Sequence, residues 1–261
     1  MDIVKLLPVI YEKFILFTLI FTRIAALLST FVLFRRELIT SRLVISLSII
    51  LSLYVLLAYA GKSIVYDVFS IDLLIQMLFQ SFIGLVTGLI LNLLFEVFVS
   101  AGQIISTQIG FSTASLIDPR FGYITSLTHF YMIVSTLLFL ILNGHLFAIK
   151  AIVDSFNVLP LYKEIIPANL LIDVLNYAGV IFSGAIMLSI TIITVLLLTN
   201  IALAIMTKFA PQFNLFSIGI NMQSIIGLIC IYVTFNLYMD NSGNLIRDCL
   251  AFLMQTLHEM R

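Results

Sequence analysis

Ionisable side chains within apolar stretches are the first candidates for chemistry in this sequence. Arg23, Glu96 and His145 each stand in such a stretch. A charge at membrane depth is costly and is usually paired or functional. A polar conduit or proton relay would need several acids or histidines in series, whereas these residues are scattered along the chain. We therefore favour a structural role, in which Arg23 and Glu96 could form an ion pair and a neutral His145 caps a helix end or bonds a carbonyl.

Patterns of known catalytic and metal-binding sites are absent from the sequence. It contains no HExxH, GxSxG, Walker A or GxGxxG pattern. The three histidines lack carboxylates at ligand spacing, and the two cysteines belong to no CxxC pair. Thirteen basic residues balance thirteen acidic ones, so no positive surplus is left to hold nucleic acid. We expect a chain that is not an enzyme, with no catalytic residue, cofactor, metal or nucleic-acid partner.

The stretch Ala101–Pro119, with the sequence AGQIISTQIGFSTASLIDP, differs from its apolar surroundings. It is rich in small and polar residues and carries no charge before Asp118. Its glycines, serines and threonines permit tight, irregular backbone. Irregular backbone at membrane depth is tolerated only where it is buried in protein or lines a cavity. Our leading hypothesis is that this stretch forms the gate of a protein-conducting channel.

The elements that position these residues are predicted to be membrane helices. Hydrophobic residues make up 62% of the 261-residue chain and charged residues 10%, whereas a soluble domain carries about a quarter charged residues. Six apolar segments approach or exceed the roughly 20 residues of a spanning helix. They cover about residues 14–34, 43–60, 73–100, 127–149, 171–206 and 215–239. The sequence thus predicts an all-α, polytopic protein of long helical hairpins in contact with membrane lipid.

The last two segments have features that a simple span does not explain. As one helix, the fifth would be about 54 Å long, against a hydrocarbon core of about 30 Å, and Gly179 or Ser183–Gly184 could bend it. A break follows at residues 208–214, where Pro211 ends the helix and Gln212 and Asn214 can satisfy freed backbone groups. We interpret this break as a hairpin turn, with a pore mouth or docking site as the alternative. Residues 247–261 have the pattern of an amphipathic tail.

Four blocks of the sequence, taken together and in order, resemble the FliR family. They are residues 23–30 in the first segment, the stretch 101–119, NGH at 143–145 followed by DSFNVLP at 154–160, and TNIALAIMTKFAPQFNLFSIG at 199–219. FliR is the flagellar member of a family of type III secretion export-gate proteins, and its injectisome counterpart is called SctT. The resemblance covers most of the chain.

The resemblance implies a fold and a set of partners. FliR-like proteins assemble with several copies of FliP- and FliQ-like subunits into a helical complex of slanted hairpins. The part before about residue 165 would then be FliP-like, and about residues 166–261 would form a FliQ-like hairpin with its tail. The family also works with FlhB- and FlhA-like proteins and with exported protein substrates. This implies a channel in the bacterial inner membrane, within the flagellar basal body.

The family's small-residue loop projects into the channel and helps to close it. By motif match, that role falls here on Gly110, Phe111, Ser112, Thr113, Ala114, Ser115, Leu116, Ile117 and Asp118. Two alternatives remain open at this point. The chain could serve a virulence injectisome in place of a flagellum, or it could be a secondary transporter or ion channel. The second alternative predicts inverted repeats and ionisable groups at mid-membrane, and the sequence offers few of either.

Overall fold

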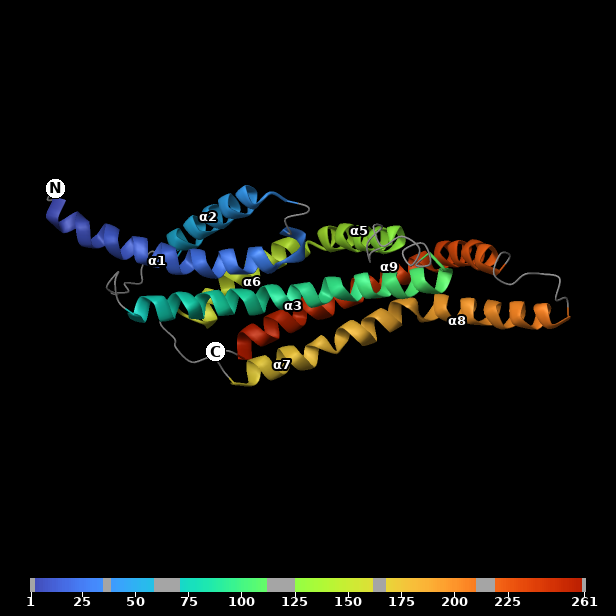
Figure 1. The fold of residues 1–261 in the computed structure, drawn as a ribbon. Coiled ribbons are helices and arrows are strands. Elements are labelled where there is room, and N and C mark those ends of the chain that lie inside the picture. Colours follow the sequence, from blue (N-terminus) through green and yellow to red (C-terminus); the bar gives the residue numbers. More distant parts are fainter. Residues whose placement is uncertain are drawn as a thin grey trace. The chain divides into compact units, whose positions relative to one another are not determined.

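Helices build the parts of the chain that the structure describes. The computed structural model describes residues 3–34, 39–58, 71–111, 125–161, 168–209 and 219–259, and no strand occurs in these ranges. Figure 1 shows the helices in chain order. They are α1 (Ile3–Thr30), the 3-10 helix η1 (Val32–Phe34), α2 (Ser41–Ala58), α3 (Ile71–Ile109), α5 (Ser126–Ile141), α6 (Gly144–Val158), α7 (Ala168–Ala178), α8 (Val180–Phe209) and α9 (Ile220–Glu259).

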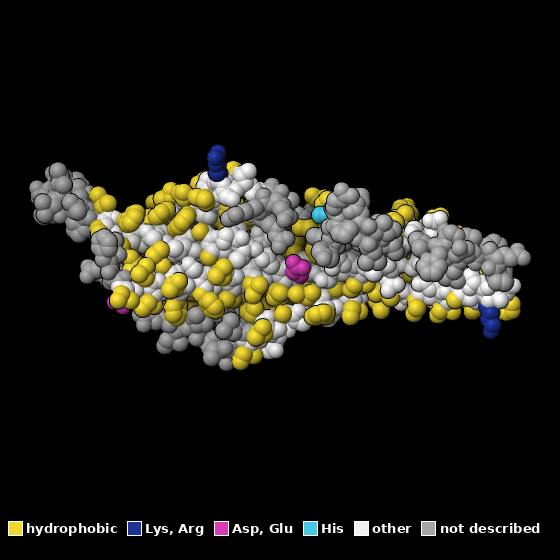
Figure 2. All heavy atoms as spheres, viewed as in Figure 1, with side chains coloured by type: hydrophobic (Ala, Val, Ile, Leu, Met, Phe, Trp, Pro, Cys, Tyr) yellow, Lys and Arg dark blue, Asp and Glu magenta, His cyan; other side chains and the backbone are white. Residues whose placement is uncertain are grey.

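The lengths and compositions of these helices are those of a multi-pass membrane protein. Five helices or helix pairs in the described ranges are long and apolar enough to cross a membrane. Six spans result if α5 and α6, which meet at a bend of 64°, count as one. Figure 2 shows hydrophobic side chains over much of the visible face, with few charged ones among them. The predicted all-α polytopic fold is therefore confirmed.

The chain divides into two compact units, and each draws on separate parts of the sequence. The first contains Met1–Asn92, His145–Tyr177 and Cys249–Arg261, and the second contains Leu93–Gly144 and Ala178–Asp248. The helices α3 and α9 each contribute residues to both units. The expected division near residue 165 into FliP-like and FliQ-like parts stays a prediction.

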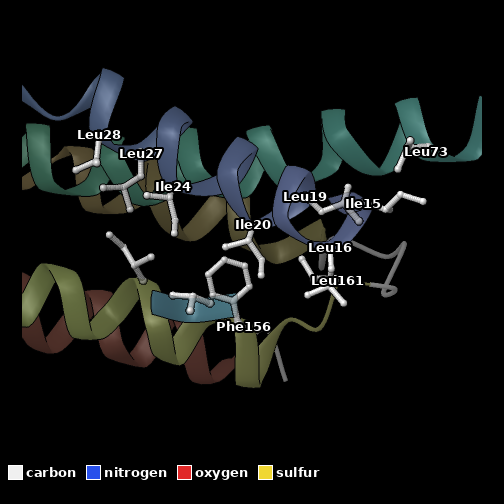
Figure 3. Close-up of a cluster of buried hydrophobic side chains, with 12 residues drawn as sticks. Ile15, Leu16, Leu19, Ile20, Ile24, Leu27, Leu28, Leu73, Phe156 and Leu161 are labelled. Carbon is white, nitrogen blue, oxygen red and sulfur yellow. The ribbon is translucent and has the colours of Figure 1, made fainter. Parts of the chain in front are cut away.

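The core of the first unit is built on one face of α1. The side chains of this face recur at spacings of three and four residues, some as neighbouring pairs, which places them in one stripe along the helix. Figure 3 shows them facing Phe156 of α6 and Leu161, with Leu73 of α3 at one end. The buried α1 residues of this cluster are Ile15, Leu16, Leu19, Ile20, Ile24, Leu27 and Leu28.

Two glycines let α1 and α3 approach closely within the first unit. A Cβ atom on Gly84 would lie 2.2 Å from the carbonyl oxygen of Arg23, and one on Gly88 would lie 2.0 Å from Oγ1 of Thr30. At the end of α1, the Asn92 side chain accepts from the Val32 amide at 2.7 Å and donates to the Thr30 carbonyl at 2.5 Å. Gly84 and Gly88 form a GxxxG pattern, and this pattern thus serves contacts inside this chain, as small residues do between membrane helices.

The second unit has an aromatic core. Phe95 packs edge-on against Phe139 of α5, with ring centres 5.4 Å apart. The rings of Tyr131 and Tyr238 lie 4.7 Å apart, and the Tyr238 hydroxyl bonds Oγ of Ser135 at 2.9 Å. These contacts join α3, α5 and α9 within the unit.

Three predicted boundaries were wrong. The third segment does not end near residue 100, because α3 continues to Ile109. The fourth segment bends after Ile141, where Asn143 adopts a φ of 58°, a conformation that asparagine tolerates. The described residues of the sixth segment and of the expected tail form one 40-residue helix, α9.

The fifth segment is interrupted at one of the two positions that the sequence suggested. A turn residue, Gly179, separates α7 from α8. Ser183–Gly184, the other position, lies within α8. A Cβ atom on Gly184 would lie 2.8 Å from Cγ1 of Val97, so this glycine provides space for a neighbouring side chain and leaves the helix continuous.

Candidate functional site

The first half of the polar stretch 101–119 is helical, which corrects the expectation of irregular backbone. Ala101 and Ile105 are fully buried, and a Cβ atom on Gly102 would lie 2.9 Å from Cα of Thr128. The small residues therefore let α5 approach the end of α3. A sequence rich in glycine and serine permits either irregular backbone or close helix packing, and here packing prevails.

Gly110, the first residue of the candidate gate loop, ends α3 in a Schellman motif. Its φ is 92°, a left-handed conformation that favours glycine. The Gly110 amide donates to the Thr107 carbonyl at 3.1 Å, and the Phe111 amide donates to the Ser106 carbonyl at 3.0 Å. This pair of bonds is the one that defines the motif. The motif therefore ends α3 after Ile109 and sets the backbone conformation at Gly110.

Most of the candidate gate lies beyond this helix end. Phe111 is an exposed side chain. The rest of the loop, Ser112, Thr113, Ala114, Ser115, Leu116, Ile117 and Asp118, lies outside the described residues. Its role as a gate stays a prediction.

Two residues of α9 that the sequence analysis did not single out bind the same helix end. The Gln223 amide nitrogen donates to the Gln108 carbonyl, and the Ser224 hydroxyl donates to the Ile109 carbonyl at 3.1 Å. Both residues follow closely on the break between the fifth and sixth segments. Neighbouring polar residues near the beginning of an apolar helix were the available signal, but the sequence does not say which carbonyls they reach.

Arg23 is buried in the first unit, and three donors of its guanidinium bind neutral acceptors. Nε donates to Oε1 of Gln80 at 2.7 Å, Nη1 to Oγ of Ser155 at 3.1 Å, and Nη2 to the Leu159 carbonyl at 3.0 Å. The guanidinium carbon also lies 4.3 Å from the ring centre of Phe156, within the range of a cation–π contact. This arrangement joins α1, α3 and α6.

Glu96, which the sequence allowed as a partner of Arg23, is an exposed side chain on α3. It belongs to the second unit, and Arg23 belongs to the first. The pairing of Arg23 with Glu96 stays a prediction.

His145 is the second residue of α6 and is half-buried. Its Nδ1 atom is buried and has no hydrogen-bond partner in the described part of the chain. The expected helix cap or carbonyl bond is therefore not formed through this nitrogen. Within the same ranges, no group of three histidine, cysteine, aspartate or glutamate side chains is arranged to hold a metal ion.

The predicted hairpin turn lies between α8 and α9. Its residues Pro211, Gln212 and Asn214 fall outside the described ranges, which stop at Phe209 and resume at Gly219. Their roles stay predictions.

Comparison with known proteins gives matches along most of the chain. Residues 14–249 match the family described as bacterial export proteins, family 1. The chain is 31% identical over 249 residues to the flagellar biosynthetic protein FliR of Buchnera aphidicola subsp. Baizongia pistaciae, covering 94% of this chain and 96% of that protein. It is 31% identical over 242 residues to FliR of Pectobacterium carotovorum subsp. carotovorum, covering 92% of each.

A shorter match connects the chain to a second group of proteins. It is 32% identical over 152 residues to the surface presentation of antigens protein SpaR of Shigella flexneri, covering 58% of this chain and 59% of that protein.

Proposed function

From the premise that this chain belongs to the bacterial export protein family 1, we propose that it is a structural and gating subunit of a type III secretion export gate. The observation that carries the proposal is the match to FliR proteins over more than nine-tenths of the chain. The helical fold with five or six possible spans fits a protein of a membrane channel. The chain is proposed to lie in the bacterial inner membrane and to act without catalysis, cofactor or metal.

The proposed channel is shared with other subunits. FliP- and FliQ-like proteins would complete its wall, FlhB- and FlhA-like proteins would act at its entrance, and exported proteins would pass through it. The longer matches carry flagellar names, which favours export of flagellar proteins. The match to SpaR keeps an injectisome as the alternative.

The gating mechanism assigned to the loop 110–118 follows from its residues. Glycine and serine let the loop pack tightly in a narrow lumen, and Phe111, Leu116 and Ile117 exclude water and ions. The Schellman motif at Gly110 gives the loop a defined starting point. A passing substrate displaces the loop, and the energy comes from other components, since the sequence has no nucleotide-binding pattern.

Ion leakage through the assembled complex tests the gate. We expect deletion of Gly110–Ser115 to make the complex permeable to small ions, measured as conductance in planar bilayers. Replacing the same six residues with a glycine–serine linker of equal length is the matched control for chain length, and it should leak because it lacks the apolar side chain of Phe111. If both variants stay closed, the loop is only a connector.

Copurification tests the assembly. A tagged chain should be recovered with FliP- and FliQ-like subunits in a stable complex. A chain that is recovered alone and transports a solute in proteoliposomes by itself would instead be a secondary transporter, and the proposal would be wrong.

A further inference from the structure

We propose that Gln223 and Ser224 are positioning residues that fix the starting point of the candidate gate loop. The inference concerns the end of α3 and the beginning of α9, both within the second unit. It rests on the proposed function only where it assigns a gating consequence to that contact.

The carbonyl groups at the end of α3 need donors from outside the regular helix. The last four carbonyls of an α-helix have no partner within the helix. In α3 these include the carbonyls of Ser106 and Thr107, which accept from the Phe111 and Gly110 amides of the Schellman motif. The motif itself provides no donor for the carbonyls of Gln108 and Ile109.

Gln223 and Ser224 supply donors to these two carbonyls. The Gln223 side-chain amide binds the Gln108 carbonyl, and the Ser224 hydroxyl binds the Ile109 carbonyl at 3.1 Å. All four terminal carbonyls of α3 are thus satisfied, two by the local turn and two by α9. Because an unsatisfied carbonyl in an apolar environment is costly, the two helices are held together at this point.

Packing sets the register of the same contact. Gly227 lies one turn beyond Gln223 on α9, and a Cβ atom there would lie 2.5 Å from Cγ1 of Ile109. Ile109 itself is fully buried. Its side chain therefore occupies the space that the absent Gly227 side chain leaves, directly beside the two hydrogen bonds.

The position of this contact gives it a consequence for the loop. Gln108 and Ile109 are the last residues before Gly110, where the chain turns out of the helix with a φ of 92°. Fixing their carbonyls fixes the backbone at Gly110 and Phe111, where the loop begins. A displacement of the beginning of α9 relative to α3 would remove both bonds together, so α9 is linked to the helix end from which the loop starts.

The test uses substitutions that remove the donors with little change of shape. Gln223→Leu and Ser224→Ala are made singly and together in the full chain, purified in complex with its copurifying subunits. Asn236→Leu is the matched control, because Asn236 is an exposed polar residue of the same helix. A spin label attached through Phe111→Cys reports on the loop; the native cysteines Cys230 and Cys249 are buried, and labelling without this substitution measures their background.

We expect the double variant to give a clearly more mobile label at position 111 than the Asn236→Leu control and, in chains that keep Phe111, a severalfold larger ion leak. Each single variant should lie between the two. An unchanged label mobility in the double variant would overturn the inference, whatever the leak. A mobile label with an unchanged leak would support the contact as the anchor of the loop and would count against the gating role of the loop in the proposed function.

Discussion

At the scale of single residues, Arg23 is a buried charged side chain whose donors need hydrogen-bond acceptors. Only 2% of its surface is exposed, and burying a charged side chain is costly unless its donors are paired. Gln80, Ser155 and the Leu159 carbonyl receive donors from three different nitrogens, and the ring of Phe156 lies against the guanidinium. These three acceptors and the ring match the planar guanidinium of arginine with its several donors, and they do not suit the ammonium group of lysine.

We expect Arg23→Lys to destabilise the first unit by about 2–4 kcal/mol, because lysine cannot reach all three acceptors and leaves buried groups unpaired. The measurement is the thermal unfolding midpoint of the purified chain in detergent. Arg42→Lys, at an exposed arginine of α2, is the control and should leave the midpoint unchanged. A midpoint for Arg23→Lys equal to that of the control would show that the charge alone is sufficient.

Gly110 is the residue whose backbone conformation the candidate gate needs. Valine is strained at a φ of 92°, by about 1–2 kcal/mol from the clash of its Cβ atom. We expect Gly110→Val to distort the end of α3 and to increase ion leakage through the complex in planar bilayers. The control is Gly243→Ala, because a Cβ atom there meets its nearest neighbour at 3.7 Å. Equal leakage by the two variants would contradict this.

At the scale of elements, the close approach of α1 and α3 depends on Gly84. A Cβ atom would lie 2.2 Å from the backbone carbonyl of Arg23, and backbone cannot move aside as a side-chain end can. We expect Gly84→Ala to force the helices apart and to cost about 1–3 kcal/mol, seen as a lower unfolding midpoint in detergent. Gly243→Ala should keep or slightly raise the midpoint, since alanine favours the helix. If Gly84→Ala also leaves the midpoint unchanged, the two helices do not depend on this contact.

The helices themselves were predictable because long apolar runs leave few other structures for a chain in lipid. Their ends were less so. The sequence AGQIISTQI at residues 101–109 is compatible with an irregular loop and with a close-packed helix. Only the proximity of Thr128 to Gly102 decides between the two. Tertiary packing also decides that α9 continues through Ser242 and Gly243. Both residues are buried, and packing overrides their weak helix propensity.

The candidate site was predictable in part for a similar reason. The small-residue composition around Gly110 indicated an unusual backbone position, and a left-handed glycine is found there. The sequence did not indicate Gln223 and Ser224, because a side-chain bond to a carbonyl more than a hundred residues away leaves no local pattern. The acceptors of Arg23 were hidden in the same way, since Gln80, Ser155 and Leu159 come from distant parts of the chain.

At the scale of the whole molecule, the exposed surface of α3 could face lipid or a partner protein. Lipid accepts exposed leucine and isoleucine at no cost, so they do not distinguish lipid from a partner protein. Glu96 does distinguish them. It is exposed and stands 24 residues, about 36 Å along the helix, from Asp72, the other charged residue of this 39-residue helix.

A carboxylate so far inside an apolar helix is costly in lipid, and we therefore expect Glu96 to face a polar or basic group of a partner subunit in the assembled complex. Glu96→Lys should then greatly reduce the amount of complex recovered with the tagged chain, because it places like charges together, and Glu96→Gln should reduce it less. Asp72→Lys, at an exposed acid in the first turn of α3, is the matched control for charge reversal. Quantitative copurification measures the effect, and full recovery with Glu96→Lys would show that this carboxylate faces water and not a partner.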